Sequence, residues 1–435
     1  MRFWDEGTET MPREELDRLQ LRLLRGTVHR LYRNSRFYHD RMREAGVRPD
    51  DIREISDSVK LPFMYKTDLR DHYPDLIFAV PRRELVRYHA SSGTTGKPTV
   101  VGYTRNDIDM WSNSLARALI SADLGEEDVV QVSNGYGLFT GGLGFHYAAE
   151  RIGATVVPAS TGNTKRQIGL IRDLRVTAIA ATPSYMVHMD EVAESLGVSI
   201  RDDTLLRVGL LGAEPWSETM RDSIQRNMGI RAQNCYGASE LAGPMFTECA
   251  EQSGIHIWKD IAMIEVIDPD TGESLPPGER GEIVLTMLQK EAMPMVRYRI
   301  GDISQIDDEV CACGRTHPRL RRISGRVDDM LIIRGINVFP SQVEHTLMSM
   351  PQVGEHYEIH VDREGSLDTM EVRVELSREA FTDDIIKLRD IRQEVADRLR
   401  EVLNIKVGVH LVEPGTLPRF EGKAKRVIDR RITDV

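Results

Sequence analysis

Cysteine and long apolar runs are scarce in this sequence. Four cysteines among 435 residues are too few for a disulfide framework, and no apolar run is long enough to span a bilayer. Basic residues are in the minority, with 57 Lys and Arg against 68 Asp and Glu. The resulting net charge of -11 argues against binding to nucleic acid or to an anionic membrane. Residues 1–6 lack the apolar core of a secretory signal, so we expect a cytoplasmic, globular chain of two or three domains.

Short apolar runs alternate with helical patterns between residues 105 and 235. The runs predict buried strands at 129–132, 154–157, 176–181 and 206–211. The patterns between them predict helices near 106–122, 143–152, 164–174, 184–196 and 216–227. This alternation is typical of a large α/β domain with a mostly parallel sheet, whose ligands bind at the carboxyl ends of the strands.

The sequence changes character near residues 325–329, which look like a short, defined joint. Beyond it, a strand, a helix, a hairpin, a helix and a strand are predicted at 330–333, 340–348, 357–376, 385–402 and 407–411. This βαββαβ order predicts a small C-terminal α+β domain of the ferredoxin-like kind. The expected domains are therefore residues 1–327 and 328–435.

One stretch combines small, hydroxyl-bearing and basic residues in an arrangement suited to phosphate. Its residues are Ser91, Ser92, Gly93, Thr94, Thr95, Gly96 and Lys97. Glycines let backbone N–H groups approach an anion, the hydroxyls add donors, and the lysine adds charge. A Walker loop would need Gly at position 91 and Ser or Thr at 98, where this sequence has Ser91 and Pro98. The stretch is therefore a different phosphate loop or, alternatively, an exposed turn.

This loop resembles the signature of the adenylate-forming ligases, the acyl-CoA synthetase superfamily. Further motifs follow in that family's order: Gly212-Ala213-Glu214, Tyr236-Gly237-Ala238-Ser239-Glu240, Arg297 to Asp302, Gly325 to Asp329, and Gly422-Lys423. The segments 136–144, 212–216, 328–344 and 415–426 are similar to those of phenylacetate–CoA ligases in particular. The resemblance implies that an acid reacts with ATP to give an acyl-adenylate and pyrophosphate. Coenzyme A then displaces AMP.

The resemblance also implies a role for each motif in holding ATP. The loop 91–97 holds the β- and γ-phosphates, Glu240 binds Mg²⁺, Tyr236 stacks on adenine and Asp302 accepts the ribose hydroxyls. Arg326 reaches the phosphates or the ribose. Further nucleotide contacts are implied for Gly212, Ala213, Glu214, Gly237, Ala238 and Ser239.

Lys423 resembles the catalytic lysine of the family, which stabilises the charge that builds up between carboxylate and α-phosphate. Asp328 resembles the hinge about which the small domain rotates between the two half-reactions. By composition alone, Lys423 belongs to a basic tail that would be a solvated face. The segment 418–421 is also one residue shorter than the family's spacing.

The acid pocket is expected to consist of small and aromatic residues that admit a flat ring. Its candidate residues are Tyr136, Phe139, Gly141, Gly142, Gly144, Gly212 and Cys235. Cys235 stands where an aliphatic residue is expected in phenylacetate ligases, so the pocket can be wider. Phenylacetate, hydroxyphenylacetate, indoleacetate and a benzoate all remain open as the acid.

Three cysteines and a histidine predict a structural Zn²⁺ site that takes no part in the chemistry. The candidate ligands are Cys249, His256, Cys311 and Cys313, with His317 as a substitute for His256. The alternative is a set of unrelated reduced thiols.

Two other functions remain open from the sequence. The chain could transfer AMP to an organic cofactor, as coenzyme F390 synthetases do, or it could bind nucleotide without catalysis. The partners expected are ATP, coenzyme A and an aryl acid. The apolar stripe of the helix after Pro12 leaves a homodimer open.

Overall fold

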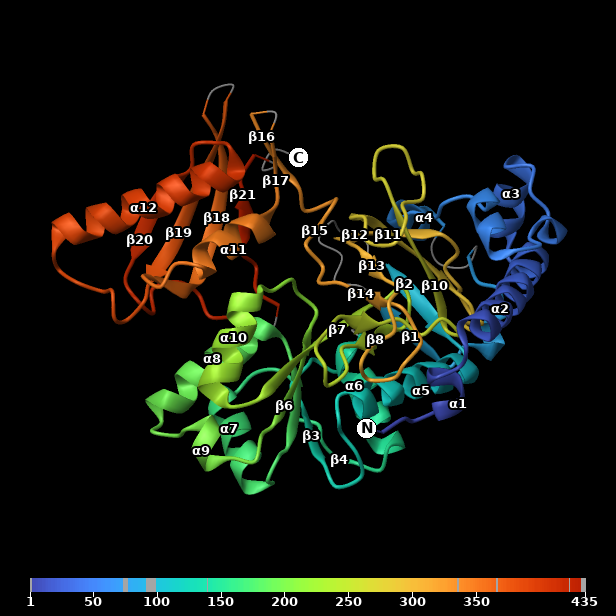
Figure 1. The fold of residues 1–435 in the computed structure, drawn as a ribbon, viewed down its shortest axis with the longest axis horizontal. Coiled ribbons are helices and arrows are strands. Elements are labelled where there is room, and N and C mark those ends of the chain that lie inside the picture. The colour runs from blue at the N-terminus through green and yellow to red at the C-terminus, as the bar shows by residue number, and fades with distance from the viewer. Residues whose placement is uncertain are drawn as a thin grey trace.

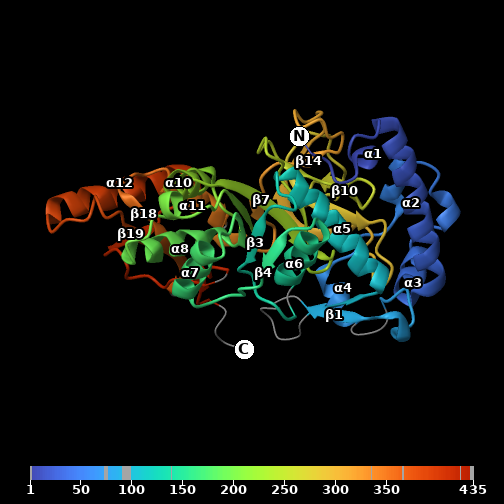
Figure 2. The same ribbon diagram turned by 90° about the horizontal axis from the view of Figure 1, so that it is seen from below.

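The computed structural model describes residues 2–72, 77–90, 99–138, 140–334, 336–364, 367–421 and 423–431. The chain forms a large N-terminal part and a smaller C-terminal part, which Figure 1 shows in orange and red. In both views, α12 and the N-terminal helices α2 and α3 lie at opposite ends of the molecule (Figures 1 and 2). Among the described residues, no helix combines the length and the apolar character needed to cross a membrane.

A six-stranded sheet lies at the centre of the N-terminal part, in the order β4-β3-β5-β6-β7-β8. Five strands are parallel, and β8 runs antiparallel to β7. The strands are β3 (Val129–Val132), β4 (Thr155–Val157), β5 (Ala178–Ala181), β6 (Val208–Gly212), β7 (Arg231–Ala238) and β8 (Gly243–Thr247). The helices that alternate with them are α5 (Arg105–Ser121), α6 (Gly141–Arg151), α7 (Thr164–Asp173), α8 (Pro183–Ser195), α9 (Ile200–Asp203) and α10 (Glu218–Met228). These parallel pairs confirm the predicted parallel α/β sheet. The prediction was possible because the inner strands are buried on both faces, and their sequences are therefore continuous apolar runs.

Smaller antiparallel sheets complete this part. A four-stranded sheet consists of β10 (Ala262–Ile267), β11 (Gly281–Met287), β12 (Tyr298–Ser304) and β15 (Gly325–Arg326). A three-stranded sheet consists of β13 (Ile306–Asp307), β14 (Arg319–Leu320) and β9 (Ile255–His256). The strands β1 (Arg87–Ala90) and β2 (Val100–Tyr103) pair with each other.

In the described part of residues 2–86, four helices precede these sheets: α1 (Glu6–Glu9), α2 (Arg13–Asn34), α3 (Arg36–Glu44) and α4 (Lys66–Asp71). Three short 3₁₀ turns lie among them or just after them, at Pro49–Asp51, Ile55–Lys60 and Arg82–Glu84. The apolar stripe of α2 is buried within this chain, since Leu16, Leu24 and Val28 have no exposed surface. That stripe therefore packs on the chain's own core.

The C-terminal part has its own apolar core, formed by residues from Leu331 onward. Its elements are β16 (Leu331–Ile333), β17 (Ile336–Val338), α11 (Pro340–Met348), β18 (Val353–Glu364), β19 (Leu367–Leu376), α12 (Ile385–Leu403), β20 (Gly408–Val412) and β21 (Val427–Asp429). The predicted α+β character is confirmed, but one strand lies elsewhere. The strand expected at 330–333 pairs with β17 outside the main sheet. The sheet has the order β20-β19-β18-β21, so its fourth strand comes from the tail and runs parallel to β18.

Candidate functional site

Several predicted site residues lie outside the residues that the structure describes. These are Ser91, Ser92, Gly93, Thr94, Thr95, Gly96, Lys97, Phe139 and Gly422. The described strands β1 and β2, which precede and follow the predicted phosphate loop in the sequence, contact other parts of the predicted site. The Tyr103 hydroxyl donates to the Ser239 carbonyl at 3.1 Å, and the Ala90 N–H donates to the Leu138 carbonyl at 2.9 Å.

The turn after β6 holds the carboxylate of Glu214 at the start of α8. Gly212 pairs with Cys235 of β7, and a Cβ at Gly212 would collide with the Cys235 carbonyl oxygen. Ala213 has a left-handed backbone, with φ 72°. One Glu214 oxygen accepts from the Ser184 N–H at 2.7 Å, and the other accepts from the Ala424 N–H at 3.0 Å. Glu214 thus lies between the two parts of the chain.

Tyr236, Asp302 and Arg326 form one hydrogen-bonded network, although they come from three strands. The Tyr236 hydroxyl donates to one oxygen of Asp302 at 2.7 Å, and Arg326 donates to the other. Burial raises the pKa of Asp302, while the Arg326 charge and the Tyr236 hydroxyl act in the opposite direction. Each carboxylate oxygen keeps a second lone pair, so Asp302 can still accept from ribose hydroxyls.

Arg326 also connects this network to the predicted hinge. Its Nε and Nη2 atoms donate to the two carboxylate oxygens of Asp328 at 2.8 and 3.0 Å. Burial would raise the pKa of Asp328, but the paired Arg326 guanidinium lowers it below its usual value. The residues expected at the ribose and at the hinge are therefore joined by one guanidinium.

Lys290 is a buried cation next to Glu240 that the sequence analysis missed. Its ammonium donates to the Glu240 carbonyl at 3.0 Å and lies 4.6 Å from the centre of the Tyr103 ring. Burial lowers the pKa of Lys290 to about 8, against the attraction of Asp107 and Glu240. The Tyr298 hydroxyl lies 3.4 Å from the Glu240 carboxylate, so both the main chain and the side chain of Glu240 are held. A lysine flanked by Gln289 and Glu291 has no local pattern that distinguishes it from a surface residue.

Lys423 is exposed, and its neighbour Ala424 makes the contact with Glu214. Arg426 lies close by, 4.4 Å from the centre of the Tyr357 ring and 3.6 Å from the Glu344 carboxylate. The tail is therefore not a uniformly solvated basic face.

The candidate acid pocket contains a tyrosine held by a histidine. The Tyr136 hydroxyl lies 3.2 Å from His146 Nδ1, with the two rings edge to face. Burial raises the pKa of Tyr136 to about 12, so its hydroxyl stays protonated at neutral pH.

Two pocket glycines also have a packing role. A Cβ at Gly142 would lie 2.7 Å from the Gly135 carbonyl oxygen, and one at Gly144 would lie 2.7 Å from the Trp111 ring. Gly141 has ordinary clearance from Asn134.

Two residues of β7 near the candidate pocket make close contacts with β8. The buried Cys235 thiol lies 3.2 Å from the Thr247 hydroxyl. Gly237 brings β7 and β8 together, because a Cβ there would collide with the main chain of Gly243.

The four predicted zinc ligands lie together in the structure. Their ligand atoms are all within 4.8 Å of one another, and all four side chains are buried. Cys249 Sγ is 3.7 Å from Cys311 Sγ, and Cys313 Sγ is 3.5 Å from His256 Nε2. Four ligands of a tetrahedral zinc ion lie about 3.8 Å apart for Zn–S bonds of about 2.3 Å, so the cluster fits this ion.

The substitute ligand His317 is less suited to that role than His256. Its Nδ1 accepts from the Lys259 N–H at 3.0 Å, and its Nε2 lies 3.1 Å from the Thr8 carbonyl. Both ring nitrogens are therefore engaged with main-chain groups outside the cluster.

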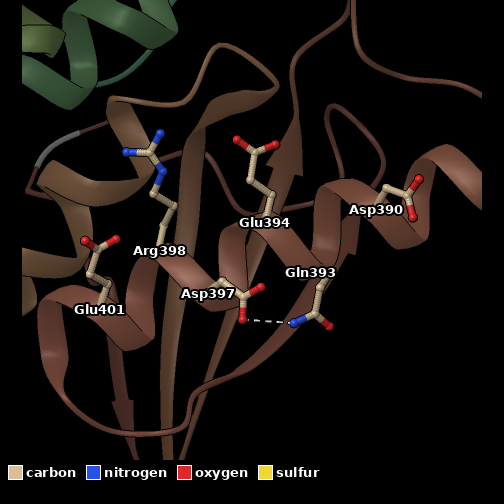
Figure 3. Close-up of a pocket in the computed structure, with 6 residues that line it drawn as sticks. All are labelled: Asp390, Gln393, Glu394, Asp397, Arg398 and Glu401. Atoms are coloured by element: carbon tan, nitrogen blue, oxygen red, sulfur yellow. Dashed lines mark hydrogen bonds between the residues drawn. The ribbon is translucent and has the colours of Figure 1, made fainter.

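A surface hollow on α12 has no part in this site. Figure 3 shows its lining residues on one exposed helix face: Asp390, Gln393, Glu394, Asp397, Arg398 and Glu401. Four carboxylates against one guanidinium would repel a polyanion such as ATP.

Comparison with known proteins gives two family matches. The profile of the AMP-binding enzyme family matches residues 66–288, and that of the AMP-binding enzyme C-terminal domain matches residues 335–431. A phenylacetate-coenzyme A ligase from Thermus thermophilus is 47% identical, over 97% of this chain and 98% of the relative.

A solved structure of 2-hydroxyisobutyryl-CoA ligase is similar over almost the whole chain. In its postadenylation state with 2-HIB-AMP, that enzyme matches 99% of this chain with 93% of its own, at 31% identity and a TM-score of 0.92. In its thioesterification state with 2-HIB-AMP and CoA, it matches 99% of this chain with 92% of its own, at 32% identity and a TM-score of 0.74. The two parts of this chain are therefore arranged more like the first state than like the second.

Proposed function

The chain belongs to the AMP-binding enzyme family and, within it, to the phenylacetate-coenzyme A ligases, and on that premise we propose that it joins an aryl carboxylic acid to coenzyme A. The acid carboxylate attacks the α-phosphorus of ATP, pyrophosphate leaves, and an acyl-adenylate forms. The thiol of coenzyme A then attacks the acyl carbon, and AMP leaves. The observation that carries the proposal is that residues from distant parts of the sequence lie together. Tyr236 bonds to Asp302 and Glu214 bonds to Ala424, and the pairing of Gly212 with Cys235 places these two contacts on neighbouring strands.

We propose that the adenosine part of ATP binds beside Tyr236 and Asp302. The Asp302 carboxylate accepts from the ribose hydroxyls, and Arg326 holds that carboxylate in place. Tyr236 faces the adenine, and the 91–97 loop receives the phosphates. Binding through main-chain and side-chain groups orients the α-phosphorus for attack.

Glu240 is the proposed ligand for Mg²⁺, which neutralises phosphate charge when bound. A carboxylate oxygen is the ligand type that this cation prefers. Its buried position and the Lys290 contact to its main chain limit the orientations open to it. Lys290 therefore supports the geometry of the proposed metal ligand.

Lys423 is the proposed catalytic residue of the first half-reaction. An ammonium placed between an attacking carboxylate and the α-phosphate stabilises the charge shared by the two anions. We place the domain boundary at 327/328 and the hinge at Asp328, so that rotation of the C-terminal domain removes Lys423 before the thiol arrives. The higher similarity to the postadenylation arrangement supports only the position of the tail against the N-terminal domain.

Phenylacetate or a related aryl acid is the proposed substrate. Tyr136 offers an aromatic wall with a protonated hydroxyl, and Cys235 leaves more room than an aliphatic residue would. Coenzyme A, rather than an organic cofactor, is the proposed acceptor, in line with the names of the relatives.

A structural zinc ion at Cys249, His256, Cys311 and Cys313 is a further part of the proposal. The buried, mutually close ligand atoms support it. The ion would join the segments around residues 249–256 and 311–313, and it would supply no step of the reaction.

The direct test is acid-dependent exchange of pyrophosphate into ATP, followed by thioester formation with coenzyme A. Exchange that requires phenylacetate, together with consumption of coenzyme A, supports the proposal. Incorporation of AMP into an organic cofactor would favour the other acceptor class. No exchange with any acid in a broad carboxylate panel would reject catalysis.

A further inference from the structure

The carboxylate of Glu214 is bound by main-chain donors from both parts of the chain. Ser184, at the start of α8, donates to Oε1 at 2.7 Å, and Ala424 of the tail donates to Oε2 at 3.0 Å. Hydrogen bonds to a charged acceptor are about twice as strong as neutral ones. With both oxygens engaged in this way, the Glu214 side chain is directed toward the tail.

The surroundings of this contact are ionic and buried. Arg426, two residues beyond Ala424, lies 3.6 Å from Glu344 Oε2. The other oxygen of Glu344 accepts from the Ser217 N–H at 3.1 Å, across the boundary between the two parts. Burial raises the pKa of Glu214, and the Arg426 charge opposes that rise and favours the ionised carboxylate. The tail is therefore hydrogen-bonded to the N-terminal domain directly at Ala424, while Arg426 reaches that domain through Glu344 of the C-terminal domain.

We propose that Glu214 is a positioning residue for Lys423. Its carboxylate anchors the Ala424 main chain and thereby holds Lys423 at the nucleotide during acid activation. The inference rests on the proposed function, because it requires that Lys423 acts in adenylation. Consecutive Cα atoms are about 3.8 Å apart, so fixing the Ala424 nitrogen restricts the main chain from which Lys423 projects. Glu214 acts through Lys423 in this role, and not by contact with the reacting atoms.

This role predicts an effect on only one half-reaction. If the C-terminal domain rotates about Asp328, the Ala424 N–H leaves Glu214, while the Ser184 N–H stays. Glu214 would then no longer influence the residues that serve thioester formation. A side chain that only lined the adenine would act differently, since the AMP group is bound in both half-reactions.

The test compares the two half-reactions in Glu214→Ala and in Ala424→Pro, which removes the same hydrogen bond from its donor side. We expect kcat for phenylacetate-dependent ATP–pyrophosphate exchange to fall about 10- to 100-fold in both variants, as loss of a charge-assisted hydrogen bond would give. Thioester formation from supplied phenylacetyl-adenylate and coenzyme A should change less than about threefold. Glu279→Gln, which removes an exposed charge from a distant turn, should leave both reactions unchanged.

Three results would overturn the inference. They are equal losses of rate in the two half-reactions, a change confined to the KM for ATP, and no loss of exchange rate in either variant. If Glu214→Ala lowers Tm strongly, Glu214→Gln and Ala424→Pro decide, because Gln keeps one acceptor oxygen and should retain part of the exchange activity. The wild-type reaction separates this inference from its premise. Absence of acid-dependent exchange in the wild type rejects the proposed function itself, whereas active wild type with symmetric losses in the variants rejects only the role of Glu214.

Discussion

Arg419 ties the two domains together in the observed arrangement, and Arg419→Met should weaken that tie. Its Nε and Nη2 atoms donate to the carboxylate of Glu191 on α8 at 2.9 and 3.1 Å. On its other side, it donates to the carboxylate of Glu375 on β19 at 2.8 and 2.9 Å. His356 Nε2 lies 3.0 Å from Glu191 as well. Met retains much of the apolar stem but none of the donors.

The magnitude follows from the interdomain half of these contacts. Hydrogen bonds to a charged group contribute about 1.5 to 3 kcal/mol, and solvent screening reduces this for the 19% and 31% exposed side chains of Arg419 and Glu191. We therefore expect a loss of about 1 to 2 kcal/mol, which shifts the domain equilibrium about 5- to 30-fold away from this arrangement. Glu375 keeps the N–H groups of Gly415 and Leu417, so the C-terminal domain should stay folded.

Two measurements check this expectation. A fluorescence distance between labels on the two domains should show a smaller population of the observed arrangement. ATP–pyrophosphate exchange should slow, while thioester formation from supplied acyl-adenylate should be unchanged or faster.

The control is Arg378→Met, which removes an exposed pair with Glu194 at 3.3 Å and should shift the equilibrium by less than about 0.5 kcal/mol. An unchanged domain distribution in Arg419→Met, or equal slowing of both half-reactions, would show that Arg419 does not hold the two domains in this arrangement.

Four further predictions concern other parts of the molecule. Lys423→Ala should reduce exchange at least about 100-fold yet leave thioester formation largely intact, and equal loss of both would remove its assigned role. Cys235→Ile should shift kcat/KM toward smaller acids, and an unchanged profile in the carboxylate panel would place Cys235 outside the pocket. The purified protein should contain about one zinc ion per chain by elemental analysis, and Cys313→Ser should lower both the metal content and Tm. A wild-type protein that is as stable without metal as with added zinc would reject the site. Burial and nearby acids raise the pKa of Asp190 to about 6, so the charged carboxylate destabilises the fold above that pH. Asp190→Asn should therefore increase the unfolding free energy at pH 7.5 by about 1 to 2 kcal/mol, after allowance for solvent screening. That gain in urea unfolding should shrink as the pH falls from 6 toward 4, and a gain independent of pH would contradict the assignment.

The sequence predicted the central sheet well because its strands are buried on both faces. Runs such as Val129–Val132 and Ala178–Ala181 consist mostly of apolar residues, which is the composition expected of such strands. The C-terminal sheet was harder, because its fourth strand is the three-residue β21 within a basic tail. A strand of that length has no periodicity to read, and its pairing with β18 depends on contacts distant in the sequence.

The candidate site also contains residues that could be predicted from the sequence and residues that could not. The cluster of three cysteines and a histidine could be predicted because cysteine is scarce in this sequence and its metal-binding chemistry is specific. The contacts of Glu214, Glu344 and Arg419 depend on how two domains face each other, which no local pattern encodes. Lys290 was missed because a buried lysine beside Glu291 has the same local sequence as an exposed one.

We propose that Glu214, Tyr236, Asp302 and the tail together activate an acid with ATP, and that Lys423 serves only this first step. The most direct measurement is ATP–pyrophosphate exchange in wild type and Lys423→Ala, with and without phenylacetate, alongside thioester formation from supplied phenylacetyl-adenylate. We expect phenylacetate-dependent exchange in the wild type, loss of this exchange in Lys423→Ala, and retention of thioester formation in the variant. Exchange that needs no acid, or a Lys423→Ala variant that exchanges as fast as wild type, would contradict it.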